Sequence, residues 1–571
     1  MIQTSSKIGV QILLEAFLHH GIEDVVFSPG SRNAPLVIGL VGSTKFRTIC
    51  IHDERSAAFY ALGMALVSGK PVPVICTSGS ALLNFSPAVA EAYYQRIPYL
   101  VISADRPLEW IDQGDGQTIR QNGVYSNFID FQISFPEEAQ TDGDKFQYNN
   151  AIQKAMTFAK YGPVHINMPF SEPLYNLMDF SPLNLPQSDE LRITQSLTAQ
   201  DFERLSTKWL TFNKRMILVG QLKPNHGLDD VLSFFANDDK TVVLSENTSN
   251  LEIENVIPCI DRTLATFDSS EVCFHPECLM VIGGAVVSKK IKSFLRAANL
   301  QLVWRIDEDF PYMDTYQRLD QSFAMNPKLF LEGLSNKFSA PHAQVQSIHF
   351  GDRWRQNFQN TQKAHKSYLS NIDFCDLKVM SLIFELLPNN SVLHLGNSSV
   401  IRYAQLFADK KQLHYYCNRG TSGIDGSVST AVGAALKDSQ QMHTLIIGDV
   451  SFFYDSNALW SNFLPENLRI VIIHNGGGGI FEIIPGPNES LFRDDFFVAK
   501  HTFSAEHLCN AFHVSFAKAD NFESLKSALE KFYTPSVNGR PKLLEVNTML
   551  SENAPVLKSY FQFLREESNS Q

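Results

Sequence analysis

Residues 448–485 read GDVSFFYDSNALWSNFLPENLRIVIIHNGGGGIFEIIP, and this stretch decides the fold that we expect. An apolar run ends in Gly-Asp, a helical pattern follows, and a second apolar run leads into Asn475 and four glycines. The order of strand, turn, helix, strand and turn is typical of a parallel α/β sheet. Asp449 and Asn475 should then leave neighbouring strands at the edge where open α/β sheets bind ligands.

The residues at these two turns have the chemistry of a metal and phosphate site. A carboxylate and an amide supply the hard oxygen ligands that Mg²⁺ favours beside phosphate oxygens. The start of the intervening helix adds free N–H groups that favour an anion. The stretch therefore predicts a cradle for Mg²⁺ and phosphate. The plainer interpretation is that Asp449 caps a helix and that the glycines form an ordinary turn.

Length and composition indicate a globular protein of several domains. A chain of 571 residues is too long for one hydrophobic core, so two to four domains are expected. Hydrophobic residues make up 44% and charged residues 19% of the chain. Because the net charge is −12 and no long basic run occurs, nucleic acid is not an expected partner. An anionic ligand would have to be held by local arginines.

The cysteines and the N-terminus favour a soluble, cytoplasmic protein. The eight cysteines are scattered, and only Cys273 and Cys278, with His275 between them, lie close together. No second pair is spaced to complete a zinc site, so reduced thiols are the simpler interpretation. There is no signal-type segment and no run of about 20 apolar residues, so no membrane association is expected.

The hydrophobic pattern predicts three α/β domains, each a doubly wound parallel sheet, with limits at 1–182, 183–350 and 351–571. An amphipathic helix is expected over 4–20, capped by Thr4 or Ser5 and ended by Gly21. A proline-rich extended linker is expected over 167–186, and a polar stretch over 337–367 should lead into the third domain. The middle domain lacks GxGxxG, which argues against a nicotinamide dinucleotide site. Strands are expected at 24–27, 48–52, 72–77, 99–104, 216–220, 241–245, 279–283, 302–306, 391–395, 413–416, 443–447, 469–473 and 542–546.

A Gly-Asp turn followed by Asn475 and glycines resembles the signature of the thiamine diphosphate enzymes. Other motifs resemble the menaquinone-pathway synthases within that family; they are SPGSRNAPL at 28–36, HDERSAAFYALGMA at 52–65, TSGSA at 77–81, ADRP at 104–107, SKK at 288–290 and NRGTSGIDG at 418–426. The resemblance implies thiamine diphosphate with Mg²⁺, or Mn²⁺, as cofactors. It also implies the substrates 2-oxoglutarate and isochorismate, and a reaction in which decarboxylation of the first is followed by conjugate addition of the succinyl unit to the second.

The resemblance also assigns cofactor contacts. Glu54 would hydrogen-bond the aminopyrimidine ring of the cofactor and promote its activation, although an acid after a strand is often just exposed. Ile424 would lie beneath the cofactor, unless it is a plain core residue. The expected metal ligands are Asp449, Asn475 and Gly477, and the diphosphate is expected beside Gly448 and Ser451.

Four arginines are the expected substrate-binding groups, because a guanidinium can hold a carboxylate in a bidentate manner. They are Arg32, Arg106, Arg402 and Arg419, all placed at or near strand-to-turn ends by the expected strands. Further substrate contacts are expected from Ser31, Gln117, Lys289, Ser398 and Phe481. The plainer alternatives are surface salt bridges for the arginines, a solvated helix start for Lys289, turn caps for the serines and core packing for Phe481.

Two positions depart from the usual cofactor motif. Val450 and His474 stand where glycine and asparagine are common, and Gly476 adds flexibility to the turn. Because Glu54 and the diphosphate motif lie in different end domains, the resemblance implies sites between the subunits of a homodimer or homotetramer. The alternative functions are another thiamine diphosphate decarboxylase or carboligase, such as an acetolactate-synthase-like enzyme, and a non-catalytic protein of the same fold.

Overall fold

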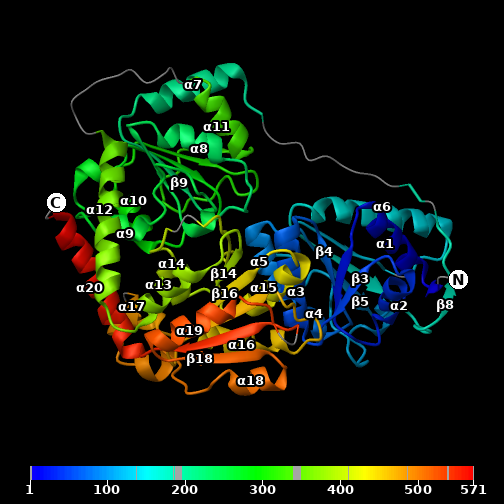
Figure 1. Cartoon of the computed structure of the whole chain (residues 1–571). Coiled ribbons are helices and arrows are strands. Elements are labelled where there is room, and N and C mark those ends of the chain that lie inside the picture. Colours follow the sequence, from blue (N-terminus) through cyan, green and yellow to red (C-terminus); the bar gives the residue numbers. More distant parts are fainter. Residues whose placement is uncertain are drawn as a thin grey trace.

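Three parallel sheets follow one another along the chain in the computed structural model (Figure 1). The structure describes residues 3–136, 138–183, 185–186, 196–337, 349–408, 411–484, 486–536 and 539–569. Side chains alternate between two cores on either face of a sheet: Val74 of the N-terminal sheet packs into one hydrophobic cluster and its neighbour Ile75 into another. The expected fold class, three α/β domains with parallel sheets, is confirmed.

The N-terminal sheet has six parallel strands in the order β3-β2-β4-β5-β7-β6. Their bounds are β2 Asp24–Phe27, β3 Arg47–Cys50, β4 Val72–Cys76, β5 Tyr99–Asp105, β6 Phe131–Ser134 and β7 Pro163–Pro169. The four expected strands are present, and β6 and β7 extend the sheet beyond them. The helices are α1 Ile8–His19, α2 Ala34–Ser43, α3 Glu54–Ser68, α4 Ser80–Leu83, α5 Ser86–Gln95 and α6 Asp142–Ala159.

The middle sheet has five parallel strands in the order β10-β9-β11-β12-β13. They are β9 Arg215–Val219, β10 Thr241–Leu244, β11 Cys278–Ile282, β12 Leu302–Ile306 and the short edge strand β13 Gln321–Phe323. Its helices are α7 Ala199–Leu210, α8 Asp229–Ala236, α9 Ile260–Leu264, α10 Lys289–Ala297 and α11 Pro327–Ser335.

The C-terminal sheet repeats the strand order of the first, as β15-β14-β16-β17-β19-β18. Its strands are β14 Val392–Leu395, β15 His414–Tyr416, β16 His443–Gly448, β17 Leu468–His474, β18 Ser515–Ala519 and β19 Lys542–Asn547. The helices are α12 Phe350–Asn371, α13 Asp376–Leu386, α14 Ser399–Ala404, α15 Ser427–Lys437, α16 Asp449–Tyr454, α17 Ile480–Ile483, α18 Glu506–Ala511, α19 Phe522–Phe532 and α20 Leu550–Asn569. Each proposed domain, 1–182, 183–350 and 351–571, encloses one of these sheets.

The N-terminal cap and the linker were predicted wrongly. Thr4 and Ser5 do not cap α1, because both belong to strand β1 (Gln3–Ser5) and the helix starts at Ile8. Strand β1 pairs antiparallel with β8 (Leu177–Asp179), so the expected linker at 167–186 contains a strand and the end of β7. Part of the expected polar stretch is helix α12, and residues 338–348 of that stretch lie outside the described residues.

Helices α3 and α15 join the two end domains within one chain (Figure 1). A Cβ on Gly63 would lie 2.0 Å from the carbonyl oxygen of Thr430, and one on Gly433 would lie 2.1 Å from that of Tyr60. Glycine therefore lets the two backbones touch at both positions. One hydrophobic cluster includes residues of both domains, so the end domains share a core.

The C-terminal helix α20 runs beside α12 and reaches the middle domain (Figure 1). There the Nζ atom of Lys290 lies 3.2 Å from the ring centroid of Phe561. The middle domain is thus attached to the third domain close to the start of α10. Within the described part of the chain, no helix has the length and apolar character needed to cross a membrane.

Candidate active site

Asp449 and Asn475 directly follow neighbouring parallel strands, as the sequence predicts. Strand β16 pairs with β17, and Gly448 lies opposite Ile473. Asp449 is 1 % exposed; its Oδ1 accepts a hydrogen bond from Val450 N at 2.7 Å. Its Oδ2 accepts from the N–H groups of Gly476, at 2.7 Å, and Gly477, at 3.1 Å. Burial raises the pKa of Asp449. Asp449 is the first residue of the short helix α16, which ends at Tyr454.

Asn475 is oriented by a buried carboxylate that the sequence did not suggest. Its Nδ2 donates to Asp376 Oδ2 at 3.0 Å, whereas its buried Oδ1 has no hydrogen-bond partner within the described residues. Asp376 is 1 % exposed and also accepts from Thr548 Oγ1 at 2.6 Å. Burial raises the pKa of Asp376 to about 6. Asp376 therefore fixes the amide so that its oxygen is free for another ligand. Only the fold brings these residues together, so no local sequence signal could have revealed the contact.

The glycine turn after Asn475 is closely packed. Gly476 has φ +84, and Gly477 has φ +159. A Cβ on Gly477 would lie 2.8 Å from the carbonyl oxygen of Val498, so the turn has no room for a side chain. The turn thus holds the backbone of residues 475–477 against the carboxylate of Asp449.

Two histidines flank Asp449. His474, His501 and Asp449 form a group that could hold a metal ion, because their possible ligand atoms lie within 4.8 Å of one another. His501 Nδ1 accepts from Phe503 N at 3.3 Å, so the neutral ring carries its proton on Nε2, which faces Asp449 Oδ2 at 3.5 Å. His474 Nε2 lies 2.7 Å from the carbonyl oxygen of Phe503 and donates to it. Both rings therefore steady the turn, which explains how His474 is accommodated; His501 was not anticipated.

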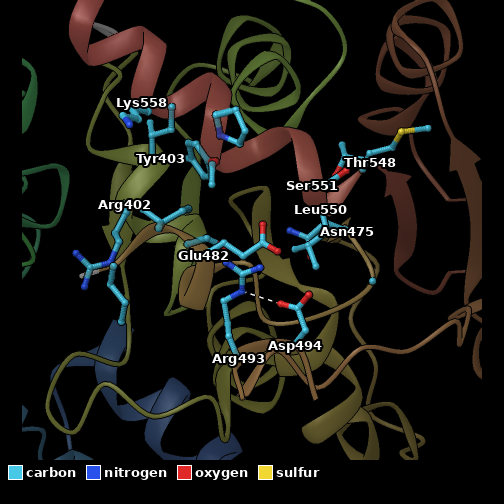
Figure 2. Close-up of a pocket in the computed structure, with 18 of the residues that line it drawn as sticks. Arg402, Tyr403, Asn475, Glu482, Arg493, Asp494, Thr548, Leu550, Ser551 and Lys558 are labelled. Carbon is cyan, nitrogen blue, oxygen red and sulfur yellow. Dashed lines mark hydrogen bonds and ion pairs between the residues drawn. The ribbon is translucent and has the colours of Figure 1, made fainter. Parts of the chain in front are cut away.

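A cavity of about 1770 Å³ opens beside this turn (Figure 2). Lys289, Arg402 and Asn475 are the expected site residues among those that line it. Figure 2 shows Arg402 and Lys558 at the left of the view and Glu482, Arg493 and Asp494, which also line the cavity, near the middle. The C-terminal helix α20 supplies part of the wall, which the sequence did not indicate.

The cations of the C-terminal domain lie close to one another. Arg402 lies within helix α14 and not in a strand-to-turn end, whereas Arg419 follows β15 as expected. Burial, followed by the charge of Arg419, lowers the pKa of Arg402. Ser398 precedes α14 with φ +76, a strained backbone for serine. Three further expected site residues on this domain are half-buried or buried, namely Ile424, Ser451 and Phe481.

A second group of expected residues gathers in the N-terminal domain. The backbone N–H of Arg32 donates to Thr77 Oγ1 at 3.2 Å, and its Nη1 donates to the carbonyl oxygen of Phe170 at 2.8 Å. Burial and the nearby charge of Arg106 lower the pKa of Arg32. Arg106 is paired with Asp115 at 2.8 Å.

The turns on either side complete this N-terminal group. A Cβ on Gly79 would lie 3.1 Å from the carbonyl oxygen of Gln117, so the two turns are in close contact. The side chains of Gln117 and Ser31 are exposed. None of the four expected residues of this group, Ser31, Arg32, Arg106 and Gln117, lines the large cavity.

Glu54 is the first residue of α3 and is half-buried. Burial raises its pKa, which suits a carboxyl that exchanges a proton. Its neighbours are tied to the C-terminal domain: Asp53 Oδ2 accepts from Asn457 Nδ2 at 2.7 Å, and Arg55 Nη2 donates to the carbonyl oxygen of Tyr454 at 2.7 Å. Glu54 itself does not line the cavity.

Comparison with known proteins agrees with this architecture. Residues 8–124 match the N-terminal thiamine pyrophosphate (TPP) binding domain of the thiamine pyrophosphate enzymes, 187–395 match the middle domain, and 395–546 match the C-terminal TPP binding domain. The chain is 42% identical to a 2-succinyl-5-enolpyruvyl-6-hydroxy-3-cyclohexene-1-carboxylate synthase of Flavobacterium johnsoniae, over 97% of this chain and 98% of that one.

Two further relatives have the same name. The synthase of Christiangramia forsetii is 42% identical over 95% of this chain and 96% of its own length. That of Porphyromonas gingivalis is 37% identical over 99% of this chain and 98% of its own. The chain therefore belongs to the 2-succinyl-5-enolpyruvyl-6-hydroxy-3-cyclohexene-1-carboxylate synthase family of the thiamine diphosphate enzymes.

Proposed function

We propose that this protein decarboxylates 2-oxoglutarate with thiamine diphosphate and adds the succinyl unit in conjugate fashion to isochorismate. The products are 2-succinyl-5-enolpyruvyl-6-hydroxy-3-cyclohexene-1-carboxylate and CO₂, in menaquinone biosynthesis. The observation that carries the proposal is the cradle of Asp449, Asn475 and Gly477 beside a cavity lined with cations. The names of full-length relatives support the choice of substrates.

The residues of the cradle fit a divalent metal and a diphosphate. Asn475 Oδ1, which is buried and has no hydrogen-bond partner among the described residues, and the carboxylate of Asp449 are hard oxygen ligands. A side chain at Gly477 would clash with the carbonyl oxygen of Val498. Asp449, Asn475 and the carbonyl of Gly477 would hold Mg²⁺ or Mn²⁺, with the diphosphate beside Gly448 and Ser451. When bound, the cofactor supplies the electron sink that makes decarboxylation of a 2-oxo acid possible.

The chain's own residues bind, orient and exchange protons. Glu54, whose burial favours the protonated form, would share a proton with the pyrimidine ring. Ile424 would support the cofactor from below. Carboxylates of the substrates would be held by Arg32, Arg106, Arg402, Arg419 and Lys289, with Ser31, Gln117 and Ser398 donating hydrogen bonds and Phe481 forming an apolar wall.

We propose that two copies of the chain complete each site. Arg32, Arg106 and Gln117 of the N-terminal domain do not line the cavity that contains Lys289 and Arg402. Because both groups suit the same carboxylate substrates, the cavity of one subunit would be completed by the N-terminal group of another. A homodimer is the smallest assembly with this arrangement, and a homotetramer would contain two such pairs.

A cytoplasmic location fits the state of the thiols. None of the eight cysteines, all of which the structure describes, is in a disulfide, and six of them are buried, which suits a reducing compartment. Neither nucleic acid nor a membrane is proposed as a partner, since the chain has an acidic net charge of −12.

One experiment tests the proposed function. The purified protein is supplied with thiamine diphosphate, Mg²⁺ and 2-oxoglutarate, with and without isochorismate, and the products are identified by mass. We expect the succinylated ring product only when both substrates are present. Decarboxylation without any ring product would overturn the choice of acceptor, and no reaction of 2-oxoglutarate would overturn the function as a whole.

A further inference from the structure

Loop 417–424 carries Arg419 and Ile424 and is held by a carboxylate from the other end of the chain. Glu91, on helix α5 of the N-terminal domain, is 1 % exposed. It accepts hydrogen bonds from Gly420 N at 2.8 Å and from Thr421 N and Thr421 Oγ1, both at 2.7 Å. All three donors belong to this loop and none is a cation. Hydrogen bonds from the loop therefore compensate for the burial of the carboxylate.

The contact leaves no space between helix α5 and the loop. A Cβ on Gly420 would lie 2.7 Å from the carbonyl oxygen of Glu91 and 3.1 Å from its carboxyl group. Any larger residue at position 420 would displace the loop. The close approach and the three hydrogen bonds define one position for the loop relative to α5.

The middle domain also contacts loop 417–424. The carbonyl oxygen of Cys417 accepts from Gln95 Nε2 at 3.2 Å and from Gln221 Nε2 at 3.0 Å. Gln221 also donates to Gln95 Oε1 at 2.9 Å, and Gln95 donates to Glu91 Oε1. Residues from all three domains therefore meet at loop 417–424.

The loop in turn determines where Arg419 lies. The N–H of Arg419 donates to the carbonyl oxygen of Cys417 at 2.8 Å, and its Nη1 donates to Asn397 Oδ1 at 2.9 Å. Asn397 Nδ2 donates to the carbonyl oxygens of Asn418 and Gly423, both at 2.7 Å. Asn397 fixes the side of the loop toward the C-terminal sheet, and Glu91 fixes the opposite side.

We propose that Glu91 is a positioning residue, through which the N-terminal domain sets the substrate-binding arginine Arg419 of the same chain. Glu91 itself touches no substrate, because its carboxylate oxygens accept hydrogen bonds from the loop and from Gln95. The inference rests on the proposed function, in which Arg419 binds a substrate carboxylate. It gives the N-terminal domain a role in positioning a substrate-binding residue of its own chain, separate from the residues it would supply to a partner subunit.

The test compares Glu91→Gln with a matched control in the full-length, cofactor-loaded enzyme. The amide keeps the shape of the side chain but turns an NH₂ group toward the N–H donors of the loop. The control is Tyr60→Phe, because Tyr60 OH donates to the carbonyl oxygen of Ala458 at 2.5 Å and so also joins the end domains, but through a residue outside the loop. Arg419→Lys identifies which substrate's KM depends on Arg419.

Glu91→Gln is expected to raise the KM of that same substrate about tenfold, with kcat changed much less, since one well-placed hydrogen bond to a charged group is lost. Tyr60→Phe should leave both KM values unchanged. In the double variant with Arg419→Lys, Glu91→Gln should add nothing further. Additive effects of the two substitutions, or a rise in both KM values, would overturn the positioning role.

A second measurement does not depend on the reaction. Amide hydrogen exchange of residues 417–423 should be faster in Glu91→Gln and unchanged in Tyr60→Phe. If the parent enzyme makes no product, the proposed function fails, whereas the exchange comparison still tests the contact. Equal exchange in the parent and in Glu91→Gln would show that Glu91 does not hold the loop.

Discussion

The two end domains share a strand order but differ in the chemistry at their strand ends. In both sheets the strand that is second in sequence lies at the edge and leads through a helix, α3 or α15, to the third strand. In the N-terminal domain the turns carry Glu54 and arginines. In the C-terminal domain the corresponding edge carries Asp449 and Asn475. The comparison teaches that topology fixes where a site can lie, and that the turns decide what it binds.

The equivalent helices also begin differently. The first turn of α3 is capped by its own Asp53, whose side chain accepts from Ser56 N at 2.9 Å. The first turn of α15 is capped from a distance by Asp455, which accepts from Ser429 N at 2.7 Å and Ser429 Oγ at 2.9 Å. The second cap ties α15 to the segment after α16, so α15 depends on tertiary structure where α3 depends on local sequence.

The largest effect is expected at the metal cradle of the C-terminal domain. Asp449→Ala should reduce kcat/KM close to 10⁴-fold, a loss of about 5 kcal/mol in transition-state stabilisation, because the only carboxylate of the cradle is lost. Isothermal titration with thiamine diphosphate and Mg²⁺ should show no binding, while circular dichroism should keep its parent spectrum. Tight cofactor binding by this variant would contradict the division of roles between the two domains.

A smaller loss is expected at Glu54 of the N-terminal domain. Glu54→Gln should slow decarboxylation of 2-oxoglutarate about 10²- to 10³-fold, since only proton exchange is removed. Binding of thiamine diphosphate should weaken far less than in Asp449→Ala, which titration of both variants would reveal. Decarboxylation at the parent rate would remove Glu54 from cofactor activation.

A substitution at the contact between α3 and α15 should lower the stability of the protein. Gly63→Ala places a methyl group 2.0 Å from the carbonyl oxygen of Thr430, so the free energy of unfolding should fall by about 1–3 kcal/mol or more. Gly143→Ala on α6 is the matched control, because its nearest neighbour in the same test is Thr141 Oγ1 at 3.6 Å. Urea unfolding followed by fluorescence should separate the two variants. Equal urea midpoints for the two variants would mean that α3 and α15 can move apart at little cost in free energy.

The distant cap of α15 should make the stability of the protein depend on pH. Asp455 is 0 % exposed, and burial raises its pKa from 3.8 to about 7. The folded state therefore binds more protons than the unfolded state between these values, and this group's contribution to stability is lost as pH rises from about 4 to about 7. The slope should reach about 1.4 kcal/mol per pH unit within that window.

Asp455→Asn should remove this part of the pH dependence, because the amide does not ionise. The free energies of unfolding in urea at pH 5 and pH 8 should therefore differ less in the variant than in the parent. An unchanged difference between the two pH values would assign the ionisation to another group.

Several strands could be predicted because short apolar runs stand between clear turns. Asp24–Phe27 and Leu302–Ile306 have the expected bounds. Strand β18 escaped notice because only Ala519 of its five residues is buried, so its apolar character is weak. Strand β1 pairs with β8 across most of the N-terminal domain, and no local pattern can reveal a partner so distant in sequence.

Some residues of the candidate site could likewise be predicted from the sequence, and others could not. Asp449 and Asn475 could be placed beside each other because parallel strands that follow in sequence often neighbour one another. Asp376, His501 and Glu91 could not, since each reaches the site from a separate element and has no motif of its own. Cationic side chains around the substrates were expected, but the contribution of α20 to the cavity wall was not. That helix begins only at Leu550, far in sequence from the expected cations of the cavity.

The shared core of α3 and α15 has a consequence for synthesis on the ribosome. Helix α3 is complete at Ser68, whereas its partner ends at Lys437. At ordinary elongation rates, roughly 20–70 s pass between the two, during which the face of α3 that packs against α15 lacks that partner. The nascent N-terminal domain is therefore the stage at which this protein should depend most on chaperones.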